Sequence, residues 1–135
     1  MNVTGVIERN DNGYYQISSE EEIGPHGLGG YGYSVAEAKE DFFKSIAEAK
    51  EMIAEETGVL PVEFEDIEVE FRYDLPSFFN YFDWINVSAF AKKSGINESK
   101  MRAYKSGLAF ASERTMERIC ATIKAIGAEL SSATL

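Results

Sequence analysis

The sequence has few of the residues that covalent or metal-centred chemistry needs. Its 135 residues include one cysteine, Cys120, and one histidine, His26. Neither has a partner at the spacing of metal ligands or of a nucleophile and its base, so we expect no metal site and no catalytic centre. A lone cysteine cannot form an internal disulfide, which favours a reducing cytoplasm. We interpret His26 as a surface residue in a loop and Cys120 as a small thiol in the core.

Long apolar runs are also missing. No window approaches the roughly 18 uninterrupted apolar residues of a transmembrane helix, and the first residues lack the basic-then-apolar pattern of a signal peptide. Hydrophobic residues still make up 44% of the chain and aromatic residues 13%, which is too apolar for a disordered chain. We therefore expect a cytoplasmic chain, not associated with a membrane, that folds into one domain or two small ones.

Basic residues are scarce, and they are unevenly distributed. Residues 1–75 contain 5 basic and 18 acidic residues, a net charge of −13, whereas residues 76–135 contain 8 basic and 5 acidic residues, a net charge of +3. A module that binds phosphates must carry its own local positive field. The sequence therefore predicts two modules with different partners, and only the second is suited to nucleic acid.

The acidic module begins with strand patterns. Residues 2–9 and 14–19 predict two strands, joined by a tight hairpin turn at Asn10-Asp11-Asn12-Gly13. Residues 20–33 have the composition of a loop, with a short third strand near 31–33. The run Gly27-Leu-Gly29-Gly30-Tyr-Gly32 matches G-x-G-x-x-G, but the βαβ unit of a dinucleotide site does not follow it, so we interpret it as a flexible or tightly turning loop and expect no cofactor.

A long helix follows in the acidic module. Ser34 and Glu37 form a capping box, and the helix runs to about Thr57, where Gly58 ends it. One apolar face recurs every three or four residues: Val35, Ala38, Phe42, Ile46, Ala49 and Ile53. Residues 67–73 then alternate apolar and charged side chains, as in a half-buried strand. The acidic runs at Glu20–Glu22 and Glu63–Glu70 are typical of solvated faces rather than of catalytic carboxylates.

Residues 86–107 have the spacing of two short helices joined by a tight turn. Asn86 can cap the first helix and Gly95 can end it, and Asn97 and Gly107 can do the same for the second. Apolar residues fall where two crossed helices pack on each other: Phe90, Ala91, Ile96, Met101 and Tyr104. This is the spacing of a helix-turn-helix, whose second helix enters the DNA major groove.

The outward face of the second helix supplies candidate DNA contacts. Arg102 can fork onto a guanine edge, and Lys100 and Lys105 can meet phosphates. The full set of candidate DNA-binding residues is Asn86, Ser88, Asn97, Glu98, Ser99, Lys100, Arg102 and Lys105. Ala103 and Ser106 should point outward as well. The alternative is an ordinary solvated face of a small helical domain.

Two further helices flank this pair. Pro76 begins one that runs to about Phe82, and Ser112 can cap another at residues 113–127. The inner side of the last helix should be formed by Met116, Ile119, Cys120, Ile123 and Ile126. Aromatic residues are dense in and after the first flanking helix: Phe78, Phe79, Tyr81, Phe82 and Trp84. Part of this cluster must be core, and the remainder could cover the junction between the modules or form a self-interface. Since two-fold operators need paired helices, we expect a homodimer through this cluster and the tail residues Leu130, Ala133 and Leu135.

The two modules resemble two known domains. Residues 86–127 resemble the helix-turn-helix domains of Cro-type repressors in the Phe90-Ala91-x-x-x-Gly95-Ile96 core and the Met101-x-x-Tyr104 pair; Val87 and Glu98 stand where those repressors often have glutamine. Residues 1–75 resemble the N-terminal domain of HicB-type antitoxins in the strand before Asp11-x-Gly13-Tyr14-Tyr15, the glycine-bearing loop through Gly29 and Gly32, and the Ser34-Val35-Ala36-Glu37-Ala38 helix start. The HicB resemblance implies an N-terminal domain that binds a small basic RNA-cleaving toxin and a C-terminal domain that binds operator DNA.

These observations combine into one hypothesis. The predicted fold is α+β: a small antiparallel sheet with one long helix (β-β-β-α-β) at residues 1–74, then an all-helical helix-turn-helix domain at residues 75–135. The predicted function is sequence-specific DNA binding by a transcriptional regulator of antitoxin type, which is not an enzyme. Its expected partners are double-stranded operator DNA and a small basic toxin. The alternative is a stand-alone protein-binding module without DNA affinity. An RNA-binding role for residues 1–75 is disfavoured by their charge of −13.

Overall fold

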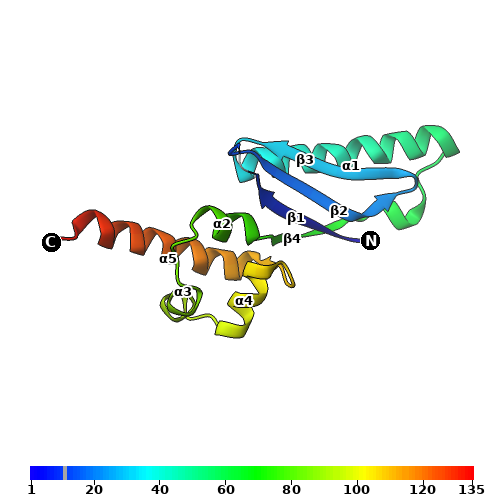
Figure 1. Cartoon of the computed structure of the whole chain (residues 1–135). Helices are drawn as coiled ribbons and strands as arrows, with labels where there is room; N and C mark the ends of the chain where they lie inside the picture. Colours follow the sequence, from blue (N-terminus) through cyan, green and yellow to red (C-terminus); the bar gives the residue numbers. More distant parts are fainter. Residues whose placement is uncertain (11) are drawn as a thin grey trace. The chain divides into compact units, whose positions relative to one another are not determined.

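The chain has an α+β fold that divides into two compact units. The computed structural model describes residues 1–10 and 12–135, without the side chains of Ser77 and Tyr81 (Figure 1). The first unit comprises residues Met1–Arg72 and the second Tyr73–Leu135, and each is described by itself. Asp11, at the predicted hairpin turn, lies outside the described residues. No helix in the described part of the chain is long and apolar enough to cross a membrane.

The first unit places one long helix against a sheet (Figure 1). Its elements are β1 (Asn2–Arg9), β2 (Tyr15–Ile23), β3 (His26–Gly32), α1 (Val35–Thr57), the 3₁₀ helix η1 (Val62–Phe64) and β4 (Glu68–Tyr73). The strand order within this unit is β3-β2-β1-β4. A further short strand, β5 (Ala111–Ser112), belongs to the second unit, which the sequence had predicted to be all-helical.

The predicted antiparallel sheet is wrong in one respect, because the sheet is mixed. β2 pairs antiparallel with both β1 and β3. Beside β1, however, the ammonium group of Met1 donates to the carbonyl of Asp66 at 2.9 Å, and the N–H of Glu68 donates to the carbonyl of Met1 at 3.0 Å. Met1 is thus hydrogen-bonded to two residues that are two positions apart on the neighbouring segment, Asp66 and Glu68. This is the hydrogen-bond pattern of parallel strands. The crossover through α1 explains it, since the helix returns the chain to the starting end of the sheet.

Residues 20–33 are not a loop, as the sequence had suggested, but two strands joined at Gly24–Pro25. The glycines there serve close packing. A Cβ on Gly30 would lie 2.5 Å from the carbonyl oxygen of Ala38, and one on Gly32 would lie 2.5 Å from the Cβ of Glu37. Tertiary packing against α1 thus overrides the low strand propensity of glycine. The G-x-G-x-x-G run belongs to this helix–sheet contact.

Side chains of α1 also seal the edge strand β3. The N–H groups of Gly29, Tyr31 and Tyr33 donate to Ser45 Oγ at 3.2 Å, Asp41 Oδ2 at 2.9 Å and Glu37 Oε2 at 2.8 Å. On its inner face α1 buries five of the six residues that its periodicity predicted, whereas Val35 in the first turn is half-buried. The five are Ala38, Phe42, Ile46, Ala49 and Ile53. The predicted Ser34 cap and Gly58 terminus are confirmed.

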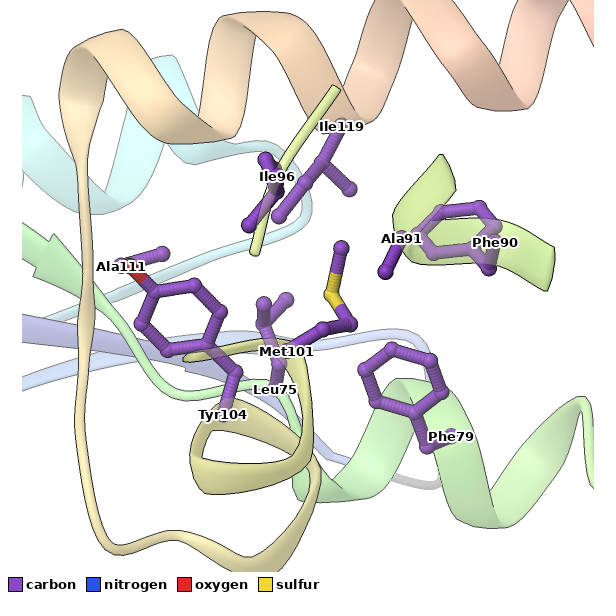
Figure 2. Packing of buried hydrophobic residues seen from close by; sticks show 9 residues of the cluster. All are labelled: Leu75, Phe79, Phe90, Ala91, Ile96, Met101, Tyr104, Ala111 and Ile119. Carbon is purple, nitrogen blue, oxygen red and sulfur yellow. The ribbon is translucent and has the colours of Figure 1, made fainter. Parts of the chain in front are cut away.

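The second unit is built around a core of its own. Its elements are α2 (Pro76–Tyr81), α3 (Val87–Ser94), α4 (Glu98–Ser106), β5 and α5 (Glu113–Ser132). Figure 2 shows the buried cluster, in which Met101 lies among side chains from the surrounding helices. The cluster comprises Leu75, Phe79, Phe90, Ala91, Ile96, Met101, Tyr104, Ala111 and Ile119.

Two predictions about α5 are wrong. The helix continues past Gly127 to Ser132, because Gly127 is followed by helix-compatible residues and does not adopt a positive φ angle. Cys120 is exposed rather than buried. The inner face is centred on Ile119 and Thr122, and the Thr122 hydroxyl is satisfied by the carbonyl of Arg118 at 2.9 Å. Cys120 lies about 100° around the helix from Ile119 and so misses the core.

Candidate nucleic-acid interface

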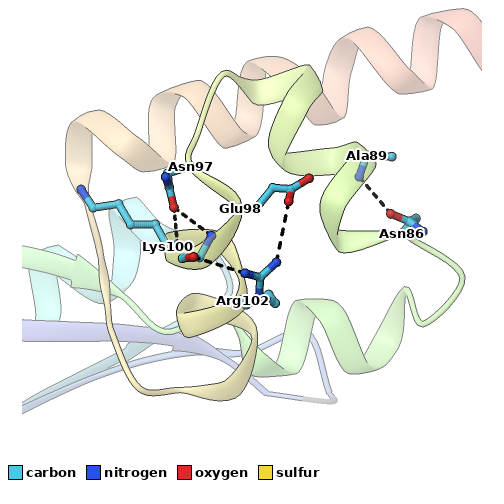
Figure 3. Close-up of polar contacts among 7 residues, drawn as sticks. Asn86, Ala89, Asn97, Glu98, Lys100 and Arg102 are labelled. Atoms are coloured by element: carbon cyan, nitrogen blue, oxygen red, sulfur yellow. Dashed lines mark hydrogen bonds and ion pairs between the residues drawn. The ribbon is translucent and has the colours of Figure 1, made fainter.

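The helices α3 and α4 are each capped by the residues that the sequence indicated. Asn86 Oδ1 accepts from the N–H of Ala89 at 2.9 Å, and Asn97 Oδ1 accepts from the N–H groups of Ser99 at 2.8 Å and Lys100 at 3.2 Å (Figure 3). Gly95 and Gly107 end the two helices with φ angles of 67° and 79°. Both boundaries of both helices are therefore set locally.

The turn between α3 and α4 is held from three sides. The N–H of Gly95 donates to the carbonyl of Lys92 at 3.2 Å, and the N–H of Ile96 donates to the carbonyl of Ala91 at 3.0 Å. The Ile96 side chain is buried in the core. From α5, Arg118 donates to the carbonyl of Gly95. Sequence reasoning missed Arg118, because its partner is a backbone group that no side-chain pattern reveals.

The inward and outward faces of α4 are sharply different. Met101 is 0% exposed and Tyr104 is 5% exposed, as predicted. Ser99, Lys100, Arg102 and Lys105 are exposed, and in Figure 3 the Lys100 side chain extends away from the helix. Glu98 and Ala103, both predicted to point outward, are half-buried. The exposed face thus carries three cations next to one partly covered carboxylate.

Arg102 is held in place on this face. Its Nη2 donates to Ser99 Oγ at 3.2 Å, and its Nη1 lies 3.9 Å from Glu98 Oε2 (Figure 3). Ser88, in the first turn of α3, is half-buried. The side-chain oxygens of Asn86 and Asn97 are used by the caps, so only their amide groups are available to another molecule.

Further basic residues lie on α3. Lys92 and Lys93 are exposed in its last turn, where cations are favoured by the helix dipole. Lys93 also pairs with Glu129 of α5 at 3.2 Å. Both lysines contribute to the positive charge of residues 76–135, but they were not among the candidate DNA-binding residues that the sequence indicated.

An apolar groove lies elsewhere on the second unit. It is lined by the exit of α2, by α3 and by the outer part of α5: Phe78, Phe82, Trp84, Ile85, Phe90, Ile123, Ile126, Gly127 and Leu130. Of the predicted aromatic cluster, Phe79 is core, Phe78 and Phe82 are half-buried, and Trp84 is 64% exposed. Tyr81 lies outside the side chains that the structure describes.

In the first unit, His26 is not in a loop but at the start of β3. It is half-buried, and its Nε2 lies 3.0 Å from Glu56 Oε1. Among the residues that the structure describes, no group of three or more His, Cys, Asp or Glu side chains is arranged to hold a metal ion. Comparisons with protein-family models, curated proteins and solved structures found no match to this chain.

Proposed function

We propose that this chain is a sequence-specific DNA-binding transcriptional regulator of antitoxin type, acting in the cytoplasm. In this proposal α3 and α4 form a helix-turn-helix, and α4 enters the major groove. The observation that carries the proposal is that α4 has one buried apolar face and one exposed basic face. Met101 and Tyr104 anchor the helix in the core, while Lys100, Arg102 and Lys105 are presented to solvent.

The charge distribution supports this assignment. Residues 76–135 have a net charge of +3, although the whole chain has −10. A surface that meets phosphates needs only its own local field, and release of counterions then supplies affinity for any duplex. The restraints on the α3–α4 turn support the same role, because a reading helix must be held at a defined angle to contact base edges.

The acidic first unit is suited to a different partner. Residues 1–75 carry a net charge of −13, which repels nucleic acid and attracts basic proteins. With the HicB resemblance, this supports a small basic RNA-cleaving toxin as the ligand. The same field also favours the second candidate function, a protein-binding module without DNA affinity.

The DNA-binding proposal is tested by selection with the full chain. A library of duplexes with a random centre is incubated with the protein at about 50 mM salt, and bound duplexes are sequenced over several rounds. We expect one motif to be enriched. Its affinity should fall with salt by about 0.9 log unit per log unit of salt for each phosphate neutralised.

A charge-reversed variant provides the control. Lys100→Glu with Lys105→Glu should select nothing, while its unfolding transition stays at the wild-type temperature because both side chains are exposed. If the wild type selects no duplex, the protein-binding module becomes the better assignment.

The toxin proposal needs a separate measurement. The full chain is used as bait in a lysate of its native cell. A small basic protein that is retained at low salt and released above about 0.5 M salt supports recognition by charge. Recovery of abundant background proteins alone contradicts it.

A further inference from the structure

An acidic and a basic side chain lie side by side on the outward face of α4. Glu98 and Arg102 are four residues apart, which places them on the same helix face one turn apart. Their charged atoms are 3.9 Å from each other, and the side chains are 41% and 57% exposed (Figure 3). Each is therefore open to a ligand while remaining within reach of the other.

We propose that Glu98 and Arg102 act together to read a single G·C base pair in the major groove. This inference rests on the proposed DNA-binding function and names the base pair that α4 recognises. Guanine presents two acceptors, O6 and N7, and the cytosine paired with it presents the N4 amino donor. Arg102 supplies donors for the guanine, and Glu98 supplies acceptors for the cytosine amino group.

The hydrogen-bonding groups of an A·T pair in the major groove do not match these two side chains. Adenine places an N6 amino donor where guanine has O6, and thymine offers the O4 acceptor and a methyl group where cytosine has its amino donor. At an A·T pair the guanidinium would face a donor and the carboxylate would face an acceptor. Both side chains would then lose water without gaining a partner, which is the costly case for charged groups.

Arg102 can read guanine without leaving its neighbours. A guanidinium has more N–H donors than its contacts to Glu98 and Ser99 use. These contacts restrict a side chain that otherwise loses much rotamer freedom on binding. Glu98 also repels phosphates, so it lowers affinity for duplex DNA in general. The expected signature of Glu98 is therefore weaker binding to all sequences and stronger discrimination among them.

Glu98 has a structural role that the experiment must separate from this one. It is the first residue of α4, where a carboxylate stabilises the helix dipole. Loss of that interaction lowers the unfolding temperature but does not change which base pair is preferred. Base preference is thus the readout that distinguishes reading from stabilising.

The experiment uses the full chain and the motif that the wild type selects from the random duplex library. Each pair of the motif is replaced in turn, and affinities are measured for the wild type, Glu98→Gln and Arg102→Ala. We expect one G·C pair whose replacement by A·T weakens wild-type binding by about 5- to 150-fold. Replacing its guanine by 7-deazaguanine, which lacks N7, should weaken binding as well.

The variants give the deciding result. Glu98→Gln should bind random duplexes more tightly than the wild type, yet it should discriminate less between G·C and A·T at that pair, because the glutamine amide can donate to the O4 of the thymine that replaces cytosine. Arg102→Ala, which removes every donor of this side chain, should lose the 7-deazaguanine effect. Glu117→Gln, which removes one exposed carboxylate from α5, is the matched control and should leave the preference unchanged.

Three outcomes overturn the inference. If the wild type selects no duplex, the proposed function fails and the inference fails with it. If a motif is selected but no G·C pair in it responds to Arg102→Ala, only the inference fails. The same holds if Glu98→Gln leaves the G·C preference at its wild-type value.

Discussion

The guanidinium of Arg118 donates a hydrogen bond from Nη2 to the carbonyl oxygen of Gly95 at 2.5 Å. This bond joins α5 to the turn between α3 and α4. Gly95 has a φ of 67°, and a Cβ at this position would lie 2.6 Å from Nη2 of Arg118. The turn therefore requires glycine for two reasons, the backbone conformation and the space that Arg118 occupies.

We predict that Gly95→Ala and Arg118→Ala both destabilise the second unit. Alanine in the left-handed conformation at position 95 should lower the free energy of unfolding by roughly 1–2 kcal/mol. Loss of the charged hydrogen bond should lower it by about 1 kcal/mol, because Arg118 is exposed. The double variant should lose less than the sum, since removing Arg118 relieves the clash with the new Cβ. Urea denaturation measures each value. Gly127→Ala, in open space on α5, is the control and should stabilise. Strict additivity would mean that the two residues do not interact.

The edge of the sheet yields a second prediction. Asp41 Oδ2 accepts from the N–H of Tyr31 on β3 at 2.9 Å. Asp41→Ala should cost about 1 kcal/mol and expose part of a strand edge that can pair with other chains. Denaturation and light scattering on storage would show lower stability and more aggregation. Glu40→Ala, its exposed neighbour, should change neither, and equal behaviour of the two variants would argue against edge sealing.

Glu21 should make stability depend on pH. Burial acts to raise the pKa of its carboxyl, but hydrogen bonds from the Ser19 hydroxyl and the Thr4 N–H outweigh this and lower the pKa below its usual 4.5. A carboxyl with a lowered folded-state pKa stabilises above its unfolded-state pKa, and the contribution disappears as pH falls through the folded-state value. Melting temperatures of the wild type and Glu21→Gln should thus differ at pH 7 and converge toward pH 3. Glu20→Gln, at an exposed position, should show no such convergence.

Sequence reasoning succeeded where the information is local. The caps Ser34, Asn86, Asn97 and Ser112 all accept the backbone hydrogen bonds expected of them. It failed where the local structure depends on contacts with residues that are distant in the sequence. Glu21 is compatible with a strand because it accepts from Thr4 on β1, and no local pattern contains that bond.

The candidate site divides in the same way. The buried anchors Met101 and Tyr104 follow from helical periodicity. The link from Arg118 to Gly95 spans 23 residues and involves a backbone carbonyl, so it follows only from the packed structure. Periodicity placed both Ile119 and its neighbour Cys120 on the apolar face of the last helix, because that face is wider than one residue. In the structure Ile119 lies at the centre of the face and is buried, whereas Cys120 is exposed.

Arg102 and Lys105 should contribute differently to DNA binding. Arg102→Ala, if the residue reads a base, should cost about 1–3 kcal/mol on the selected motif and relax preference at one position. Lys105→Ala, if the residue meets phosphate, should weaken binding to all sequences alike and lower the salt slope by about one. Titrations on the selected and random duplexes at several salt concentrations separate the two. Wild-type binding by both variants would exclude this face of α4 from the interface.

The groove beside Trp84 should join two copies of the chain. Two-fold operators require reading helices about 34 Å apart, and a single short helix makes too few contacts for useful specificity. Trp84 is 64% exposed and Leu130 is 60% exposed at the rim of a groove lined by apolar side chains, and burying them against a second copy removes this surface from water. Light scattering should therefore report a dimer at micromolar concentration.

Leu130→Glu should convert it to a folded monomer, because the new carboxylate cannot be buried without a partner. Leu108→Glu, at a residue that is 86% exposed and outside the groove, should leave the dimer intact. A wild-type monomer at high micromolar concentration, or a Leu130→Glu variant that still dimerises, would place the interface elsewhere or exclude it.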